Sequence, residues 1–164
     1  QNLCLRCGFC CDGTIFMKVQ LEEQDDAGKL SLFQITSVQG DFFFQQPCFA
    51  FDQIKGCRIY HIRPIKCRKF SCKLLSQLKN QELTFKKAMA LTERTRQLKL
   101  ALFKEAARHH IDKKFFLNTR TLVDHIESDL PSRDRKHNYG DARVRCADFS
   151  AYLHKYFVRD RPPE

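Results

Sequence analysis

Alternating apolar and polar residues in the first third of the chain predict short β-strands. The alternation runs through residues 14–19 (TIFMKV) and 29–35 (KLSLFQI), with a polar turn between them. Residues 40–47 (GDFFFQQP) are bounded by Gly and Pro and also favour a strand. Residues 48–62 alternate as well and predict a β-hairpin that turns at DQIKG, where Gly56 supplies a left-handed backbone position. We therefore expect a small antiparallel sheet of three to five strands.

The apolar spacing changes to a helical period beyond this hairpin. Pro64 fits the first turn of a short helix over residues 63–72, and Leu74, Leu75 and Leu78 continue a helix after it. This short helix carries two cysteines among several lysines and arginines, and positive charge of this kind favours thiolates.

Two longer helices and one final helix are predicted after residue 80. Apolar side chains three to four residues apart indicate helices over 83–108 and 119–130, the second of which stops at Pro131. Residues 129–145 are expected to form a charged loop, and 147–157 a last short helix. The two predicted apolar stripes are Leu91, Thr95, Leu98, Leu102 and Ala106, and Thr119, Leu122, Val123, Ile126 and Leu130.

Together these patterns predict an α+β protein with cysteine-rich loops on a small antiparallel sheet, followed by an α-helical C-terminal half. The length of 164 residues fits one domain. We expect a cysteine-rich region over 1–73 and a basic helical region over 74–164 that packs on it.

Nine cysteines supply the candidate chemistry, and eight of them lie within the first 72 residues. They form two groups, C-x2-C-x2-C-C and C-x8-C-x9-C-x4-C. A disulfide framework is one interpretation. Three observations disfavour it: the odd count, the single cysteine in the rest of the chain, and the strain of pairing Cys10 with Cys11. Metal binding is favoured instead, because cysteines three residues apart can surround one ion. The predicted ligands are Cys4, Cys7, Cys10, Cys11, Cys48, Cys57, Cys67 and Cys72.

Ligands made only of thiolates suit zinc or an iron–sulfur cluster and do not suit magnesium or calcium. The run C-x2-C-x2-C is similar to the first three ligands of a bacterial ferredoxin, which slightly favours iron. Eight thiolates fit two four-coordinate sites, or one cluster and one single-ion site. In an extended backbone Cys10 and Cys11 would serve different centres, whereas a local turn would let both touch one cluster. Gly8, within this loop, can adopt a positive φ.

With both groups in view, the chain resembles the bacterial CxxCxxCC cysteine-cluster family. The resemblance covers residues 4–72 and implies chelation of zinc or iron by the eight cysteines, with Cys48 at the first position of the second group. We expect the side chains of Tyr60, Arg63 and Arg68 to surround the ligands, because arginine donates hydrogen bonds to coordinated sulfur. The family pattern C-x-I-Y-x2-R-P-x2-C-R-x-F-x-C matches Cys57, Ile59, Tyr60, Arg63, Pro64, Cys67, Arg68, Phe70 and Cys72.

One branch of this family includes the flagellin lysine N-methylase, so the resemblance also implies S-adenosylmethionine-dependent methylation of protein lysines. The six glycines include no G-x-G spacing of the nucleotide-binding kind. The methyl donor would therefore bind through the metal centre or through a pocket without a sequence signature. No paired carboxylates, Ser–His–Asp order or phosphate loop indicates another catalytic site.

Charge is divided unevenly along the chain. Residues 1–60 hold five Lys and Arg against seven Asp and Glu, whereas residues 61–164 hold 24 against 12. A solvated helix surface is the simplest interpretation. Binding to an acidic protein or to nucleic acid, as in a zinc-stabilised nucleic-acid-binding module, is the second. The cations of the long helix are Lys86, Lys87, Arg94, Arg96, Lys99, Lys104 and Arg108.

The remaining chemistry-bearing residues have simpler interpretations. His61 is expected to be a packed or exposed residue more than a ligand, and Cys146 a buried structural thiol. No apolar run is long enough to span a membrane and no signal peptide is visible, so we expect a cytoplasmic protein. The chain begins at Gln1 without an initiator Met, as a trimmed chain would.

Overall fold

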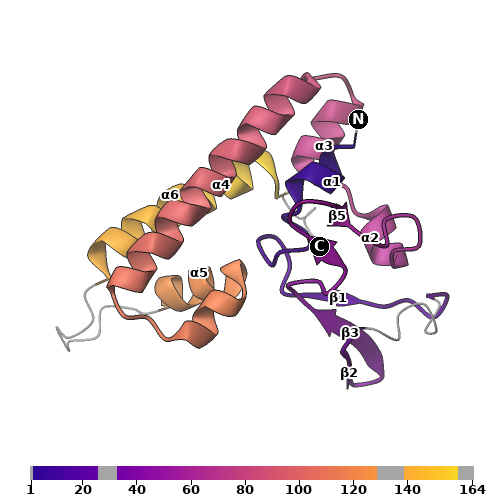
Figure 1. Ribbon diagram of the computed structural model, residues 1–164, viewed down its shortest axis with the longest axis horizontal. Coiled ribbons are helices and arrows are strands. Elements are labelled where there is room, and N and C mark those ends of the chain that lie inside the picture. The colour runs from indigo at the N-terminus through magenta and orange to yellow at the C-terminus, as the bar shows by residue number, and fades with distance from the viewer. Residues whose placement is uncertain (1, 26–32, 129–138, 159–164) are drawn as a thin grey trace, which may run out of the picture. The chain divides into compact units, whose positions relative to one another are not determined.

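A computed structural model describes residues 2–25, 33–128 and 139–158. The chain divides into two compact units, one over residues 2–71 and one that begins at Cys72. Strands occur in the first unit and long helices in the second (Figure 1). The predicted α+β fold, with helices concentrated in the C-terminal half, is confirmed. The packing of the two regions into one domain stays a prediction.

The first unit is built on a three-stranded antiparallel sheet in the order β1-β3-β2 (Figure 1). Its strands are β1 (Lys18–Gln20), β2 (Ile35–Val38) and β3 (Asp41–Gln45). Phe44 of β3 pairs with Val19 on one side and Ile35 on the other, and its side chain is only 2% exposed. Phe33 packs against Phe44 with ring centroids 4.7 Å apart. The small core of this unit therefore lies on the face of the sheet that carries Phe44.

Two of the predicted strands differ from the strands observed. Residues 14–17 are not part of a strand, because Asp12 and Gly13 turn the chain there: Thr14 N–H donates to Asp12 Oδ1 at 3.0 Å, and Gly13 has a φ of 80°. The strand predicted over 29–35 begins only at Ile35, and residues 29–32 lie outside the described residues. The strand predicted over 40–47 is confirmed as β3.

A short helix that the sequence did not predict precedes the sheet. Helix α1 (Leu3–Cys7) begins where Asn2 Oδ1 accepts a hydrogen bond from Cys4 N–H at 3.1 Å. It ends at Gly8, whose φ of 74° is the positive value that the sequence predicted. Five residues are too few to give an apolar period, which is why the pattern gave no signal.

The predicted hairpin is present as β4 (Phe51–Asp52) and β5 (Gly56–Cys57). Asp52 Oδ1 closes its turn by accepting hydrogen bonds from Ile54 N–H at 2.8 Å and Lys55 N–H at 2.7 Å. Gly56 has the predicted left-handed backbone, with a φ of 75°. Helix α2 (Ile65–Lys69) follows and is shorter than the predicted 63–72, because the backbone becomes extended at its C-cap, Phe70.

Replacing Gly56 with Ala is expected to destabilise the first unit more than replacing Gly40 with Ala. Both glycines have a positive φ, which costs an alanine about 1–2 kcal/mol. Only at Gly56 would the new Cβ also meet backbone, since it would lie 2.6 Å from the carbonyl oxygen of Leu5 in α1. A Cβ at Gly40 meets nothing within 4 Å. Urea unfolding of both variants measures the difference in free energy of unfolding. Equal losses of stability in the two variants would contradict close packing of α1 against β5.

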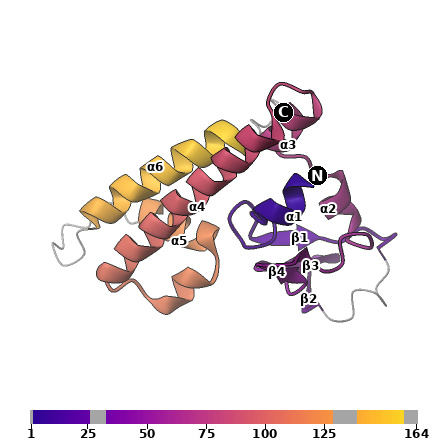
Figure 2. The same cartoon turned by 45° about the horizontal axis from the view of Figure 1, so that its top comes forward.

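The second unit is helical and contains α3 (Lys73–Lys79), α4 (Phe85–Arg108), the 3₁₀ helix η1 (Lys113–Leu117), α5 (Thr119–Ser128) and α6 (Gly140–Tyr156). Helix α6 lies along α4, and α5 packs on both η1 and α6 (Figure 2). The predicted stripe of α4 faces the core: Leu91, Thr95, Leu102 and Ala106 are buried, and Leu98 is half-buried. The stripe of α5 is buried at Thr119, Leu122, Val123 and Ile126.

Helix α6 begins earlier than predicted. Residues 140–145 are helical instead of forming a charged loop, and the rest of that predicted loop, 129–138, lies outside the described residues. The reason is an apolar face at helical spacing, which extends the helix through a charged sequence. This buried face consists of Ala142, Cys146, Phe149 and Leu153. Among the helices in the described ranges, none is both long enough and apolar enough to cross a bilayer.

Candidate metal centre

Four cysteines approach one another in the first unit, and each comes from a different segment. Cys11 lies in the loop after α1, Cys48 precedes β4, Cys57 belongs to β5 and Cys67 to α2. The backbone joins two of these segments directly, because Cys48 N–H donates to the carbonyl of Cys11 at 2.7 Å. Cys57 pairs with Phe51 across the hairpin, and Phe51 N–H donates to the carbonyl of Cys48 at 3.0 Å.

Burial and neighbouring thiolates both act on the ionisation of these thiols. Burial raises the pKa of Cys11 far above its ordinary value, and the charges of three neighbouring thiolates raise it further. Burial raises the pKa of Cys67 to about 12, with further contributions from Cys48 and Cys57. Burial and the charge of Cys57 also raise the pKa of Cys48. The three thiolates that act on Cys11 are those of Cys48, Cys57 and Cys67. We call these four residues the thiol cluster.

Two arginines partly offset the negative charge of the thiol cluster. The guanidinium of Arg63 lies 3.8 Å above the ring of Tyr60, and its charge lowers the pKa of Cys67 against the larger effect of burial. Arg58 acts in the same sense on Cys48 and donates to the carbonyl of Phe49 at 2.9 Å. Sequence reasoning missed Arg58, although its position directly after Cys57 was a usable signal. Arg68, a predicted neighbour of the ligands, is exposed on α2.

The other four predicted ligands belong to helix α1, to the loop after it and to the start of α3. Helical spacing places Cys4 and Cys7 on one face of α1, and Cys10 follows beyond the left-handed turn at Gly8. Cys72 belongs to the second unit, where its Sγ accepts a hydrogen bond from Leu75 N–H at 3.3 Å and caps α3. No disulfide joins any of the nine cysteines, all of which lie within the described residues, and this disagrees with a disulfide framework. The predicted role of Cys4, Cys7, Cys10 and Cys72 as ligands stays a prediction.

Comparison with protein families identifies the chain. The model of a family described as "CxxCxxCC: Putative zinc- or iron-chelating domain" matches residues 3–146. The chain belongs to the CxxCxxCC family. This match extends the resemblance seen over 4–72 through α4 and α5 into α6, so the helical unit is also part of the CxxCxxCC domain. Comparisons with curated proteins and with solved structures gave no match.

The donor set of the thiol cluster fits the chemistry of this CxxCxxCC domain. Four sulfur donors suit zinc or iron and not magnesium or calcium. Within residues 2–25, 33–128 and 139–158, no three His, Cys, Asp or Glu side chains are spaced closely enough to hold an ion as they stand. The four thiols therefore come from neighbouring segments, but their sulfur atoms are not spaced to coordinate one ion. The raised pKa values of Cys11, Cys48 and Cys67 mean that a metal would have to displace protons from these thiols.

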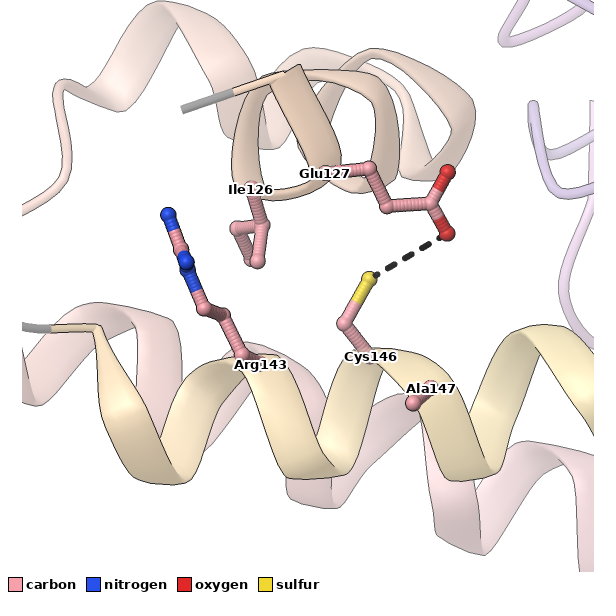
Figure 3. A pocket seen from close by; sticks show the side chains of 5 residues that line it. All are labelled: Ile126, Glu127, Arg143, Cys146 and Ala147. Atoms are coloured by element: carbon pink, nitrogen blue, oxygen red, sulfur yellow. Dashed lines mark hydrogen bonds between the residues drawn. The ribbon is translucent and has the colours of Figure 1, made fainter. Parts of the chain in front are cut away.

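Cys146 belongs to helix α6 of the second unit. Its thiol faces Glu127 at the edge of a pocket of about 230 Å³ between α5 and α6 (Figure 3). The sulfur lies 3.9 Å from Glu127 Oε1 and 4.0 Å from the carbonyl of Val123. Burial, followed by the charge of Glu127, raises the pKa of Cys146 to about 11. A buried, protonated thiol of this kind is unreactive, in agreement with the predicted structural role.

Proposed function

We propose that this chain binds zinc or iron through the thiol cluster, with Cys11, Cys48, Cys57 and Cys67 as thiolate ligands. The observation that carries the proposal is the convergence of these four half-buried thiols from four segments of one small unit. The family match supports chelation of zinc or iron by this domain. Cys4, Cys7, Cys10 and Cys72 remain predicted ligands.

The energetics of the thiol cluster support this proposal. Burial and mutual repulsion both disfavour thiolates, and Arg58 and Arg63 offset only part of that cost. A bound cation would favour all four thiolates at once. It would also cross-link the loop after α1, the hairpin and α2, in a unit whose strands are two to five residues long. A structural role follows for zinc, and a structural or redox role for iron.

Anaerobic purification tests this function. Elemental analysis of the full chain should find zinc or iron in near-stoichiometric amount. Reloading the metal-free chain should release protons, because burial raises the pKa values of Cys11, Cys48 and Cys67. A brown protein whose broad visible absorption bleaches in air would assign an iron–sulfur cluster, and a colourless protein with bound zinc would assign zinc. A chain that holds neither metal, both as purified and after anaerobic reloading, would contradict the proposal.

The other functions raised by the sequence gain no support from the described residues. The family match does not extend to S-adenosylmethionine binding, and lysine methylation stays a prediction of the resemblance. On α4, Arg96 and Arg108 pair with Glu93 at 3.3 Å and Glu105 at 2.9 Å. These pairs within the helix neutralise part of the basic face, so binding of an acidic protein or nucleic acid stays a prediction as well.

A further inference from the structure

The helix that carries Cys67 is capped by a residue distant in sequence. Helix α2 is five residues long and begins at Ile65 after Pro64, which makes no capping hydrogen bond with its side chain. The first N–H groups of a helix have no partner within it. Here the N–H of Ile65 donates to Asp25 Oδ1 at 2.8 Å. Asp25 thus supplies the cap that Pro64 cannot.

The second carboxylate oxygen of Asp25 holds its own turn together. Asp25 Oδ2 accepts a hydrogen bond from Glu22 N–H at 2.9 Å, and Asp25 N–H donates to the carbonyl of Glu22 at 2.9 Å. Glu22 Oε1 lies 3.1 Å from Lys66 Nζ, a second link from this turn to α2. The turn follows β1 directly, and α2 packs against β1. Residues 22–25 therefore fix the start of α2 on the sheet.

Cys67 lies in the first turn of α2, two residues after the hydrogen-bonded Ile65. Its side chain packs against the small core that contains Val19 and Phe44. A helix of five residues has little stability of its own. The direction of the Cys67 thiol therefore depends on the contacts that hold α2, and the hydrogen bond from Ile65 to Asp25 is one of them.

We propose that Asp25 is a positioning residue for the thiol cluster, which holds Cys67 toward Cys11, Cys48 and Cys57 through the backbone N–H of Ile65. The inference rests on the proposed metal binding. The position of the Asp25 carboxylate carries this inference through the hydrogen bond to Ile65 N–H, whereas its negative charge disfavours the Cys67 thiolate. Position and charge therefore predict opposite effects on metal affinity, which separates them experimentally.

Cobalt(II) titration of the full chain without oxygen tests the proposal, because thiolate-to-cobalt charge-transfer absorption reports the ligands directly. Asp25→Ala is expected to lower cobalt affinity about 10–100-fold, the usual effect of losing a contact that orients a ligand. Asp25→Asn retains an acceptor for Ile65 N–H and should restore much of that affinity. The matched control is Glu23→Ala, an exposed residue of the same turn, whose affinity should stay within about twofold of the wild type.

A double-mutant cycle shows whether Asp25 acts through Cys67. Adding Asp25→Ala to a Cys67→Ser variant should cost little further affinity, whereas an equal loss in both backgrounds would overturn the proposal. Wild-type cobalt affinity in Asp25→Ala would overturn it too. If Asp25→Ala does not fold, hydrogen exchange of the wild-type chain provides the test. The Ile65 amide should be protected from exchange, and exchange at the rate of an exposed amide would overturn the inference. A wild-type chain without charge-transfer absorption would instead contradict the metal centre itself.

Discussion

Replacing Cys11 with Ser is expected to lower the affinity for zinc by more than about 100-fold. Changes to residues that only orient a ligand cost about 10–100-fold, and loss of a thiolate ligand should exceed that range. Cys11 is the thiol on which each of the other three cluster members acts electrostatically. A serine hydroxyl has nearly the same size but does not ionise near neutral pH, so the variant removes a ligand and leaves the packing almost unchanged. Competition with a chromophoric zinc chelator measures the affinity.

Cys146→Ser is the matched control for this experiment. Cys146 is buried and lies in the helical unit against Val123 and Glu127. The same change at Cys146 replaces a weakly hydrogen-bonded thiol between packed helices. It should leave zinc affinity and stoichiometry unaltered. Equal zinc affinity in the Cys11→Ser variant and the wild type would remove Cys11 from the centre. The proposed ligand set would then be wrong.

Removal of the metal is expected to unfold the first unit while the helices of the second remain. The strands of residues 2–71 are two to five residues long, and the buried cluster at the sheet consists of Val19, Phe33, Phe44 and Ala50. In small zinc domains metal binding contributes about 10–16 kcal/mol, and the metal-free chain is unfolded. Hydrogen exchange of the full chain before and after chelation should therefore show loss of protection in β1, β3 and the hairpin.

The helical unit provides the internal control in the same experiment. Helices α4, α5 and α6 bury Leu102, Leu122, Ile126 and Phe149 almost completely, and this core involves none of the thiol cluster. Amides of these helices should keep their protection after chelation, and the far-UV circular dichroism should stay strongly helical. Unchanged protection of the sheet after complete metal removal would mean that the centre does not stabilise this unit.

Much of the fold follows from local patterns in the sequence. The strand-like residues between Gly40 and Pro47 predict β3, and the helical stripe over 83–108 predicts α4. Gly8 and Gly56 have the positive φ values expected of them. These predictions depend on near neighbours along the chain, which is the information that hydrophobic periodicity contains. The patterns do not predict helix α1, because it is short. They also do not predict the early start of α6, because charged residues obscure its apolar face.

The sequence by itself determined the classes of element, the candidate cysteines and the expectation that they bind zinc or iron. It divided the cysteines into groups by their spacing, with Cys11 in the first group and Cys48, Cys57 and Cys67 in the second. Only the tertiary structure placed Cys11 with those three thiols, through the hydrogen bond from Cys48 N–H to the Cys11 carbonyl. Only the structure connected Asp25 to α2. The physical reason is that these contacts join residues far apart in the chain, and no local periodicity records which distant partners will meet.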